Sequence, residues 1–277
     1  MRRLILVLLA ALALAPAPAT AAGDDRFEAL RALDARVGAI AFRLSLANSG
    51  RCAGATALQD GLVLHSIEQY GGADREAAAS AYRLGAHIGV MAVVPGSPAD
   101  AAGLSADDQL VSANGRALRA SGDGSGAEPR GFVTAAERIL ADEYAQGAVT
   151  IGVLRDGHPF DLRLVPRPGC AARIEMLPGR GVNAWANGER IMVSAGLALR
   201  ATSDDALAMV IGHEMAHNLL GHRLHGHRRA RFEEEADRLG FALALAAGYD
   251  GGRAMAGLAG LVRDAKRTRR LASFIPG

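Results

Sequence analysis

Two histidines four residues apart give the sharpest chemical signal in the sequence. The segment HEMAH contains His213 and His217, with Glu214 directly after the first of them. On a helix, residues i and i+4 lie on one face, so the two imidazoles can hold a single zinc ion. Glu214 then lies at the edge of the same site, where its carboxylate can take a proton from water at the metal. The spacing predicts a metal-assisted hydrolytic site.

A second segment, RFEEEADRLG at residues 231–240, supplies the further carboxylates that a metal site needs beside the two histidines. Two histidines on a helix can also make ordinary hydrogen bonds, whereas catalytic zinc needs three protein ligands and one open position. Glu233 is the expected third ligand. Asp237, one turn later, can accept a hydrogen bond from a ligand imidazole and so determine its tautomer. Glu234 and Glu235 are expected to be solvated charges.

The histidines require a helix, and residues 201–221 have the pattern of one. The segment opens with Thr202 and Asp205 at capping-box spacing and ends at Gly221, which suits a C-terminal cap. Apolar residues recur at every fourth position from Leu207 onward and form one continuous face. We expect this helix to lie in the middle of a domain.

The pair HEMAH and EEEAD resembles the HExxH and ExxAD motifs of the HtpX and CAAX-prenyl-protease family of zinc metallopeptidases, peptidase family M48 of the gluzincins. The resemblance covers about residues 182–249 and implies one Zn²⁺ per chain. In that family a strand beside the metal binds the substrate backbone. Here that strand precedes the hairpin turn Asn187-Gly188. Its residues are Asn183, Ala184, Trp185 and Ala186.

Two features depart from this family. Its members commonly continue past the last helix into a His-Pro and Arg segment near the site, whereas this sequence ends at residue 277. Either a shortened tail is tolerated or activity is reduced. The family's transition-state stabiliser is usually a His or Tyr, and no residue is assigned to that role. His222, His225 and His227 are expected to form a solvated basic turn.

Residues 88–165 have short β-prone runs separated by turns. HIGV at residues 87–90, PGSPADAAGL at 95–104 and DDQLVSANGR at 107–116 resemble a bacterial PDZ domain, with a helix expected over 132–144. A hairpin is expected at Asp156-Gly157. Asp107 stands where a glycine is usual, and the Gly/Ser stretch at 121–131 is long.

The resemblance to a PDZ domain implies a peptide-binding strand edge. An extended peptide tail would add as a strand, and its terminal carboxylate would meet backbone amides of Ile88, Gly89 and Val90. The alternative is a degenerate copy that only packs against its neighbour.

Residues 1–22 are typical of a secretory signal. Two arginines precede an apolar run from Leu4 to Ala15, which is short for a membrane span, and small residues follow. The alternative is an uncleaved anchor. We expect a periplasmic or secreted protein with no stable membrane insertion after removal of the signal. In such an oxidising compartment Cys52 and Cys170 can form a disulfide, although two buried free thiols remain the alternative.

The composition excludes other classes of protein. Of 277 residues, 50% are hydrophobic and 22% charged, which is a folded rather than a disordered composition. Without Arg2 and Arg3 of the expected signal, the 31 basic residues fall to 29 and equal the 29 acidic ones. A neutral chain disfavours binding driven by charge to nucleic acid or membranes.

Together these features predict an α+β protein. We expect a signal peptide at 1–22, an N-terminal helical segment at 23–84 that packs on the protease domain, a PDZ-like β-barrel domain at 85–167, and a helical zinc metallopeptidase domain with a small β-hairpin edge at 168–277. The resemblances imply a zinc endopeptidase of protein quality control that hydrolyses unfolded or flexible protein segments. The alternatives are a PDZ adaptor or holdase with a non-proteolytic zinc site, and a zinc hydrolase acting on non-peptide bonds.

Overall fold

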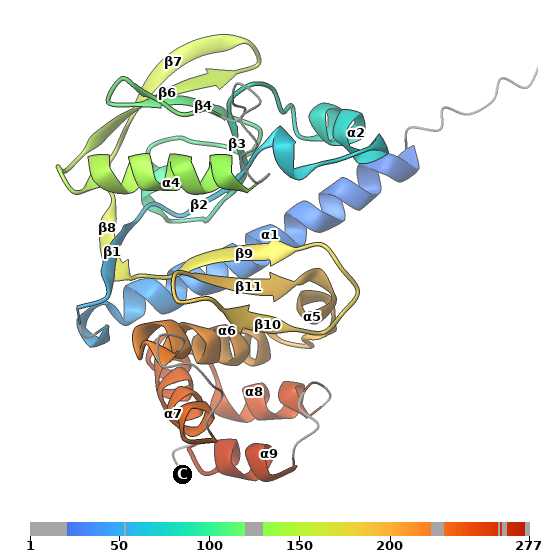
Figure 1. Cartoon of the computed structure of the whole chain (residues 1–277), viewed down its shortest axis with the longest axis vertical. Helices are drawn as coiled ribbons and strands as arrows, with labels where there is room; N and C mark the ends of the chain where they lie inside the picture. Colours follow the sequence, from blue (N-terminus) through green and yellow to red (C-terminus); the bar gives the residue numbers. More distant parts are fainter. Residues whose placement is uncertain are drawn as a thin grey trace, which may run out of the picture.

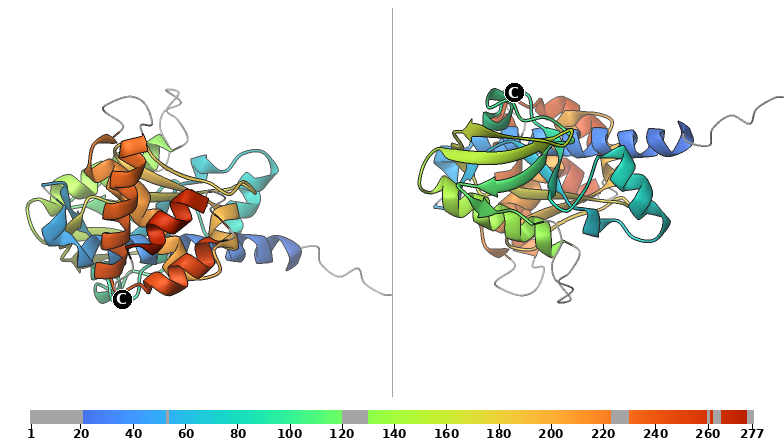
Figure 2. Two further views of the ribbon diagram at one scale, coloured as in Figure 1. Left: turned by 90° about the horizontal axis from the view of Figure 1, so that it is seen from below. Right: turned by 90° about the horizontal axis from the view of Figure 1, so that it is seen from above.

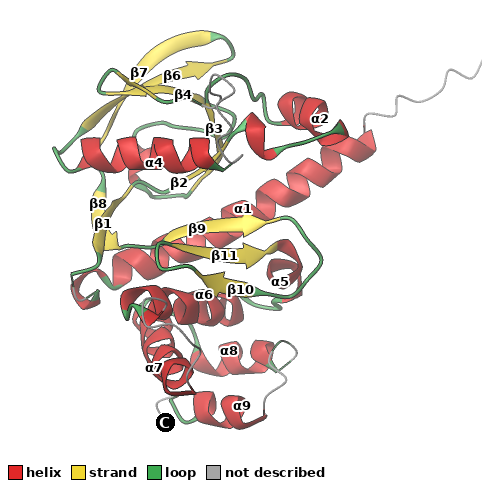
Figure 3. Cartoon of the chain, in the orientation of Figure 1, coloured by secondary structure: helices red, strands yellow, loops and turns green. Residues whose placement is uncertain are grey.

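The computed structural model describes residues 21–52, 54–119, 130–222, 230–259, 261 and 265–274, with backbone alone at 21–24 and 265–268. The chain is an α+β protein, as predicted, in which a six-stranded sheet and a smaller three-stranded sheet lie on either side of a long N-terminal helix (Figures 1 and 3). Residues 1–20 of the expected signal lie outside the described part. Within that part, no helix combines the length and apolar character needed to cross a membrane.

Helix α1 (Ala21–Ala47) spans both halves of the molecule (Figure 1). Apolar residues at helical spacing, from Phe27 to Leu44, form its buried face. Its outer side carries arginines: Arg31 donates to Asp107 at 2.6 Å, and Arg36 donates to Asp204 at 2.7 Å. Because those aspartates belong to different halves of the chain, α1 ties the halves together.

The six-stranded module comprises residues 60–164. Its strands are β2 (Leu62–His65), β3 (Ile88–Val93), β4 (Gln109–Ala113), β5 (Arg116–Ala117), β6 (Val149–Arg155) and β7 (His158–Leu164), in the antiparallel order β2-β3-β4-β6-β7 with β5 on β4. Helices α3 (Pro98–Ala101) and α4 (Gly131–Tyr144) complete it. Its core contains Ile88, Leu110 and Ile151, all fully buried.

The turns of this module follow the local chemistry. Asp156 and Gly157 have φ of 50° and 79° and form the predicted hairpin between β6 and β7. Asp107, in the position usual for glycine, has φ of 69°, a conformation that glycine adopts without strain. The sheet also begins earlier than expected: β2 lies ahead of the boundary placed at residue 85, within the segment expected to be helical. That segment keeps only η2 (Ile67–Gln69) and α2 (Ala73–Ala81) between β2 and β3.

A two-stranded ribbon connects the module to the rest of the chain. Strand β1 (Thr56–Gln59) pairs antiparallel with β8 (Arg167–Cys170), so the chain enters and leaves the module at one place. A disulfide joins Cys52 to Cys170 beside this ribbon, just after the short helix η1 (Ser49–Arg51). This is the pairing that the sequence allowed, and it closes the loop containing the whole insertion.

The helical part, residues 173–274, holds the second sheet. Strands β9 (Arg173–Leu177), β10 (Ala184–Ala186) and β11 (Arg190–Ser194) have the order β10-β11-β9, with β11 parallel to β9 and antiparallel to β10. Helices α5 (Ala195–Arg200), α6 (Asp204–Leu219), α7 (Ala230–Ala246), α8 (Gly251–Leu258) and α9 (Ala265–Ala272) follow. The last three cover the lower face of the molecule (Figure 2, left).

Candidate metal centre

Helix α6 carries both histidines of HEMAH through the centre of the helical part. Ser203, rather than the expected Thr202, caps its first turn, because its side chain accepts a hydrogen bond from Ala206 N–H at 3.1 Å. Leu207 and Ile211 on the predicted apolar face are fully buried. Burial of this face leaves His213 and His217 on the side that meets α7.

The close approach of α7 to α6 depends on two glycines. A Cβ atom on Gly212 would lie 2.7 Å from the carbonyl oxygen of Gly240, and one on Gly240 would lie 2.5 Å from the backbone nitrogen of His213. Both distances are too short for real Cβ contacts, so only glycines allow this crossing. Two turns before Gly240, α7 carries Glu233 opposite the histidines.

The three expected ligands converge. Their donor atoms all lie within 4.8 Å of one another. The Nε2 atoms of His213 and His217 are 3.1 Å apart, and carboxylate oxygens of Glu233 lie 3.5 Å from the first and 3.7 Å from the second. Ligands at about 2.0–2.1 Å from a tetrahedral zinc ion are themselves separated by about 3.3 Å. The two imidazole nitrogens and the Glu233 carboxylate, which has a different oxygen nearest to each histidine, are therefore close enough together to hold a zinc ion.

Asp237 contacts His213, the first of the expected ligands. Its side chain is 1% exposed, and its Oδ1 lies 2.9 Å from Nδ1 of His213. Because Nδ1–H donates to the carboxylate, the lone pair on Nε2 points to the metal position. The other oxygen of Asp237 pairs with Arg270 of α9. Arg270 was missed in the sequence because it lies 33 residues from Asp237 and belongs to no motif.

His217, the second expected ligand, contacts His222, which was expected to be solvated. Nδ1 of His217 lies 2.9 Å from Nδ1 of His222, and Nε2 of His222 lies 3.2 Å from a carboxylate oxygen of Glu235. His222 is buried and stacks on Phe232 with ring centroids 4.5 Å apart. The expectation that His222 is solvated was wrong, because its ring is buried against Phe232 at the start of α7, whereas the Glu235 side chain remains 42% exposed.

The His217–His222–Glu235 contacts are compatible with one set of histidine tautomers. If Nε2–H of His222 donates to Glu235, then Nδ1 of His222 accepts the proton of His217 Nδ1. The Nε2 atom of His217 is then free of a proton and can bind a metal. His225 and His227 lie outside the described residues.

The base and the expected substrate strand lie beside this centre. Glu214 is half-buried and follows His213 on α6. Strand β10 packs along α6 and is the edge of its sheet, since it pairs only with β11 among the described strands. Ala184, Trp185 and Ala186 form β10, whereas Asn183 precedes it and its carbonyl accepts hydrogen bonds from Ser194.

Strand β3 does not offer the peptide-binding edge that was expected at Ile88, Gly89 and Val90. Both sides of β3 are occupied: Gly89 pairs with β2 on one side and with β4 on the other. Val90 N–H donates to the carbonyl of Asp108, and its side chain is fully buried. The expectation for these three residues was wrong. Strand β2, which is distant in sequence, occupies the edge of β3 to which the peptide was expected to add.

The sequence matches two known families over parts of its length. Residues 166–229 match the model of peptidase family M48, a stretch that includes β9–β11 and HEMAH and ends before Glu233. Residues 89–124 match the model of a PDZ domain. No curated protein matches the chain. Among solved structures, the crystal structure of the HtrA3 PDZ domain bound to a phage-derived ligand (FGRWV) is 19% identical, with a TM-score of 0.29, and the match covers 41% of this chain and 88% of that one.

Proposed function

We propose that this chain, a metallopeptidase of family M48 that contains a PDZ domain, is a zinc-dependent endopeptidase acting on unfolded or flexible protein segments. The convergence of His213, His217 and Glu233 from two helices supports the proposal most directly. A structural zinc site normally has four protein ligands, whereas three leave a position for chemistry.

Different residues of the site would bind the metal, transfer the proton and orient the ligands during peptide hydrolysis. Zinc held by the three ligands would lower the pKa of a water molecule toward ~7 and polarise the peptide carbonyl. Glu214 acts as general base: its carboxylate takes a proton from the attacking water and passes it to the departing amine. Asp237 and His222 keep the two ligand imidazoles in the tautomers that this requires.

Strand β10 is the proposed substrate platform. Strand β10 lies at the edge of its sheet among the described strands, and an extended peptide can add to such an edge as a further strand. A folded protein rarely exposes a segment that can be extended in this way, so cleavage would favour unfolded or flexible regions. The PDZ domain would bring such polypeptides to the enzyme.

A periplasmic or extracellular location completes the proposal. The signal pattern at residues 1–22 supports it, and so does the Cys52–Cys170 disulfide, since disulfides persist mainly in oxidising compartments. A role in protein quality control would suit a protease of unfolded chains there.

Three variants test the function. Glu214→Gln should abolish casein hydrolysis while the protein still binds one zinc, and Glu233→Ala should lose the zinc. Glu234→Ala is the matched control. This neighbouring carboxylate is 51% exposed, and its ion pair with Arg238 is long, at 3.9 Å. Full hydrolysis by Glu214→Gln would refute the catalytic assignment. Absence of chelator-sensitive hydrolysis in the wild type would instead favour the PDZ adaptor.

A further inference from the structure

A large cavity lies beside helix α1, where the six-stranded module meets strand β9. Its volume is about 590 Å³, which is in the range of sites for small molecules. None of the three expected metal ligands lines it. We call it the α1 cavity. Much of its wall is apolar and includes Leu30, Leu33, Val63, Met91, Ile174 and Met176.

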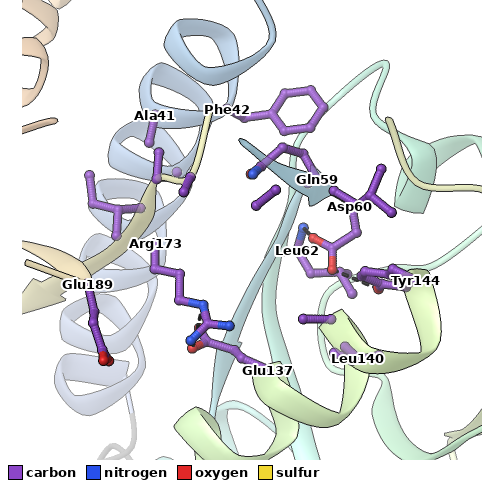
Figure 4. Close-up of a pocket in the computed structure, with 18 of the residues that line it drawn as sticks. Ala41, Phe42, Gln59, Asp60, Leu62, Glu137, Leu140, Tyr144, Arg173 and Glu189 are labelled. Atoms are coloured by element: carbon purple, nitrogen blue, oxygen red, sulfur yellow. Dashed lines mark hydrogen bonds and ion pairs between the residues drawn. The ribbon is translucent and has the colours of Figure 1, made fainter. Parts of the chain in front are cut away.

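Three carboxylates that line the α1 cavity are paired with arginines that line it too. The pairs are Asp74 with Arg26, Glu137 with Arg190, and Glu175 with Arg130. Glu137 also lies 4.0 Å from Arg173 of β9, beside a smaller neighbouring cavity (Figure 4). The arginines offset the charges of these three carboxylates, so none of the three requires a cation from a ligand.

The carboxylate of Asp34 lines the same cavity and has no such partner. Asp34 is half-buried on α1, four residues after Leu30. Among the described residues, its side chain makes no hydrogen bond and no ion pair. Burial raises the pKa of Asp34 to about 7, and the negative charge of Glu175 adds to this effect. A buried carboxylate without a partner is costly at neutral pH, and such groups are typical of binding sites.

Aromatic rings lie near this carboxylate. Phe27, Tyr70 and Tyr82 line the cavity, and the two tyrosine rings are 5.8 Å apart between centroids. Burial, assisted by the negative charge of Asp34, raises the pKa of both tyrosine hydroxyls, so both stay neutral. The guanidinium of Arg31 already lies 4.9 Å from the centroid of the Tyr82 ring. Carboxylate and aromatic faces together are suited to an organic cation.

The other charged and titratable neighbours do not supply that cation. Arg31, three residues before Asp34 on α1, donates to Asp107 at 2.6 Å and to the carbonyl of Met91 at 2.8 Å. His65 of β2 is neutral, because burial lowers its pKa to about 3. Arg190 of β11 lies between the carboxylates of Glu137 and Glu175. Asp34 therefore remains available to a cation from outside the protein.

We propose that the α1 cavity binds a small organic molecule with a primary ammonium group, which pairs with Asp34, and an aromatic body, which packs against Tyr70 and the apolar wall. An ammonium group has three N–H donors and no acceptor, so it complements an unpaired carboxylate. The site is separate from the metal centre, and the inference does not depend on the proposed peptidase activity.

Two ligands of the same shape test the role of charge. Isothermal titration calorimetry measures binding of 2-phenylethylamine and of 2-phenylethanol, which has a hydroxyl in place of the ammonium, to the full chain. The amine should bind about tenfold more tightly or better, as expected for a hydrogen bond to a charged group. Equal binding of amine and alcohol, or no binding of the amine at millimolar concentration, would overturn the proposal.

The pH dependence gives a second measurement. With a pKa of about 7, Asp34 is ionised in about a tenth of the molecules at pH 6 and in about nine tenths at pH 8. The amine needs the ionised form, so its affinity should rise about tenfold between these two values. The affinity of 2-phenylethanol should stay constant over the same range. An amine affinity that falls as the pH rises would contradict the pairing.

Variants of two carboxylates in the same cavity test the location. Asp34→Asn keeps the shape of the side chain but removes its charge, so it should abolish both the preference for the amine and the pH dependence. Asp74→Asn is the matched control, because Asp74 lines the cavity but is 56% exposed and pairs with Arg26. It should leave the amine affinity within about twofold of wild type. Equal loss in both variants, or no loss in Asp34→Asn, would refute the assignment.

A chelator separates this site from the metal centre, since an amine can also bind a metal ion. Protein treated with a chelator should bind 2-phenylethylamine as well as untreated protein does. Loss of amine binding on chelation would place the ligand at the metal and overturn the inference. Unchanged amine binding in a protein that fails to cleave casein would retain the α1 cavity site and refute only the peptidase.

Discussion

The substitution Asp237→Asn tests how the metal ligands are supported. It keeps the shape of a side chain that is 1% exposed, but it removes a negative charge between His213 and Arg270. The amide oxygen can still accept from His213 Nδ1–H, yet a neutral acceptor makes the imidazole a weaker ligand. Loss of such a supporting carboxylate typically weakens metal binding about 10- to 100-fold, or roughly 1.4–2.8 kcal/mol.

The same change affects the stability of the metal-free protein. The amide nitrogen of the new side chain would face the guanidinium of Arg270, so two donors oppose each other. Breaking a buried ion pair costs about 3–5 kcal/mol, but the Arg270 side chain is 31% exposed and water can solvate part of it. We therefore expect a smaller loss of about 1–3 kcal/mol.

Two assays separate these effects. Zinc affinity is measured by competition with a chromogenic chelator, and the free energy of unfolding of the metal-free protein by urea titration. Asp142→Asn is the matched control, since this aspartate is 63% exposed on α4. Arg270→Gln leaves the His213 contact intact and should reduce zinc affinity less than Asp237→Asn does. Zinc affinity within twofold of wild type in Asp237→Asn, or a larger loss in Arg270→Gln, would refute the reasoning.

Three further predictions concern packing, ionisation and the covalent link. Gly240→Ala should push α7 away from α6, lower the zinc affinity and reduce the free energy of unfolding in urea by about 1–3 kcal/mol. Gly50 has open space around it, so Gly50→Ala should change neither the zinc affinity nor the stability. Burial raises the pKa of Asp34 from 3.8 to about 7. The protonated Asp34 therefore contributes stability to the folded protein that is fully present below pH 4 and is lost as the pH rises through 7. Asp34→Asn should therefore exceed wild type in stability at pH 8, by on the order of 4 kcal/mol, and match it near pH 3; equal pH dependence would contradict this. Replacing both Cys52 and Cys170 by alanine opens a link across 118 residues and should cost about 5 kcal/mol, whereas a loss under about 1 kcal/mol would show that the link barely constrains the unfolded chain.

Local signals predicted the elements that carry the chemistry. The helical spacing of His213 and His217 and the apolar face from Leu207 placed α6 correctly, because both depend on residues within a few positions of each other. The Asp156-Gly157 hairpin was predicted for the same reason. The cap moved by one residue, from Thr202 to Ser203, since either hydroxyl could serve and only the path of the chain selects between them.

The peptide-binding edge shows where local reasoning fails. The segment at β3 has the residues expected of such an edge, and nothing near it in the sequence reveals that both of its sides are paired. Strand β2 lies more than twenty residues earlier and has only a short apolar run. Strand order is a property of the whole sheet, so it could not be predicted from either segment alone.

The sequence by itself determined the kinds of side chain at the centre and their spacing along each helix. The tertiary structure alone decided how those helices meet: Gly212 and Gly240 set the crossing, Arg270 arrives from a distant segment to pair with Asp237, and α7 buries His222 under Phe232. The physical reason is the range of the forces. Helix periodicity and capping act over a few residues, whereas close packing and buried ion pairs join residues that only the folded chain brings into contact.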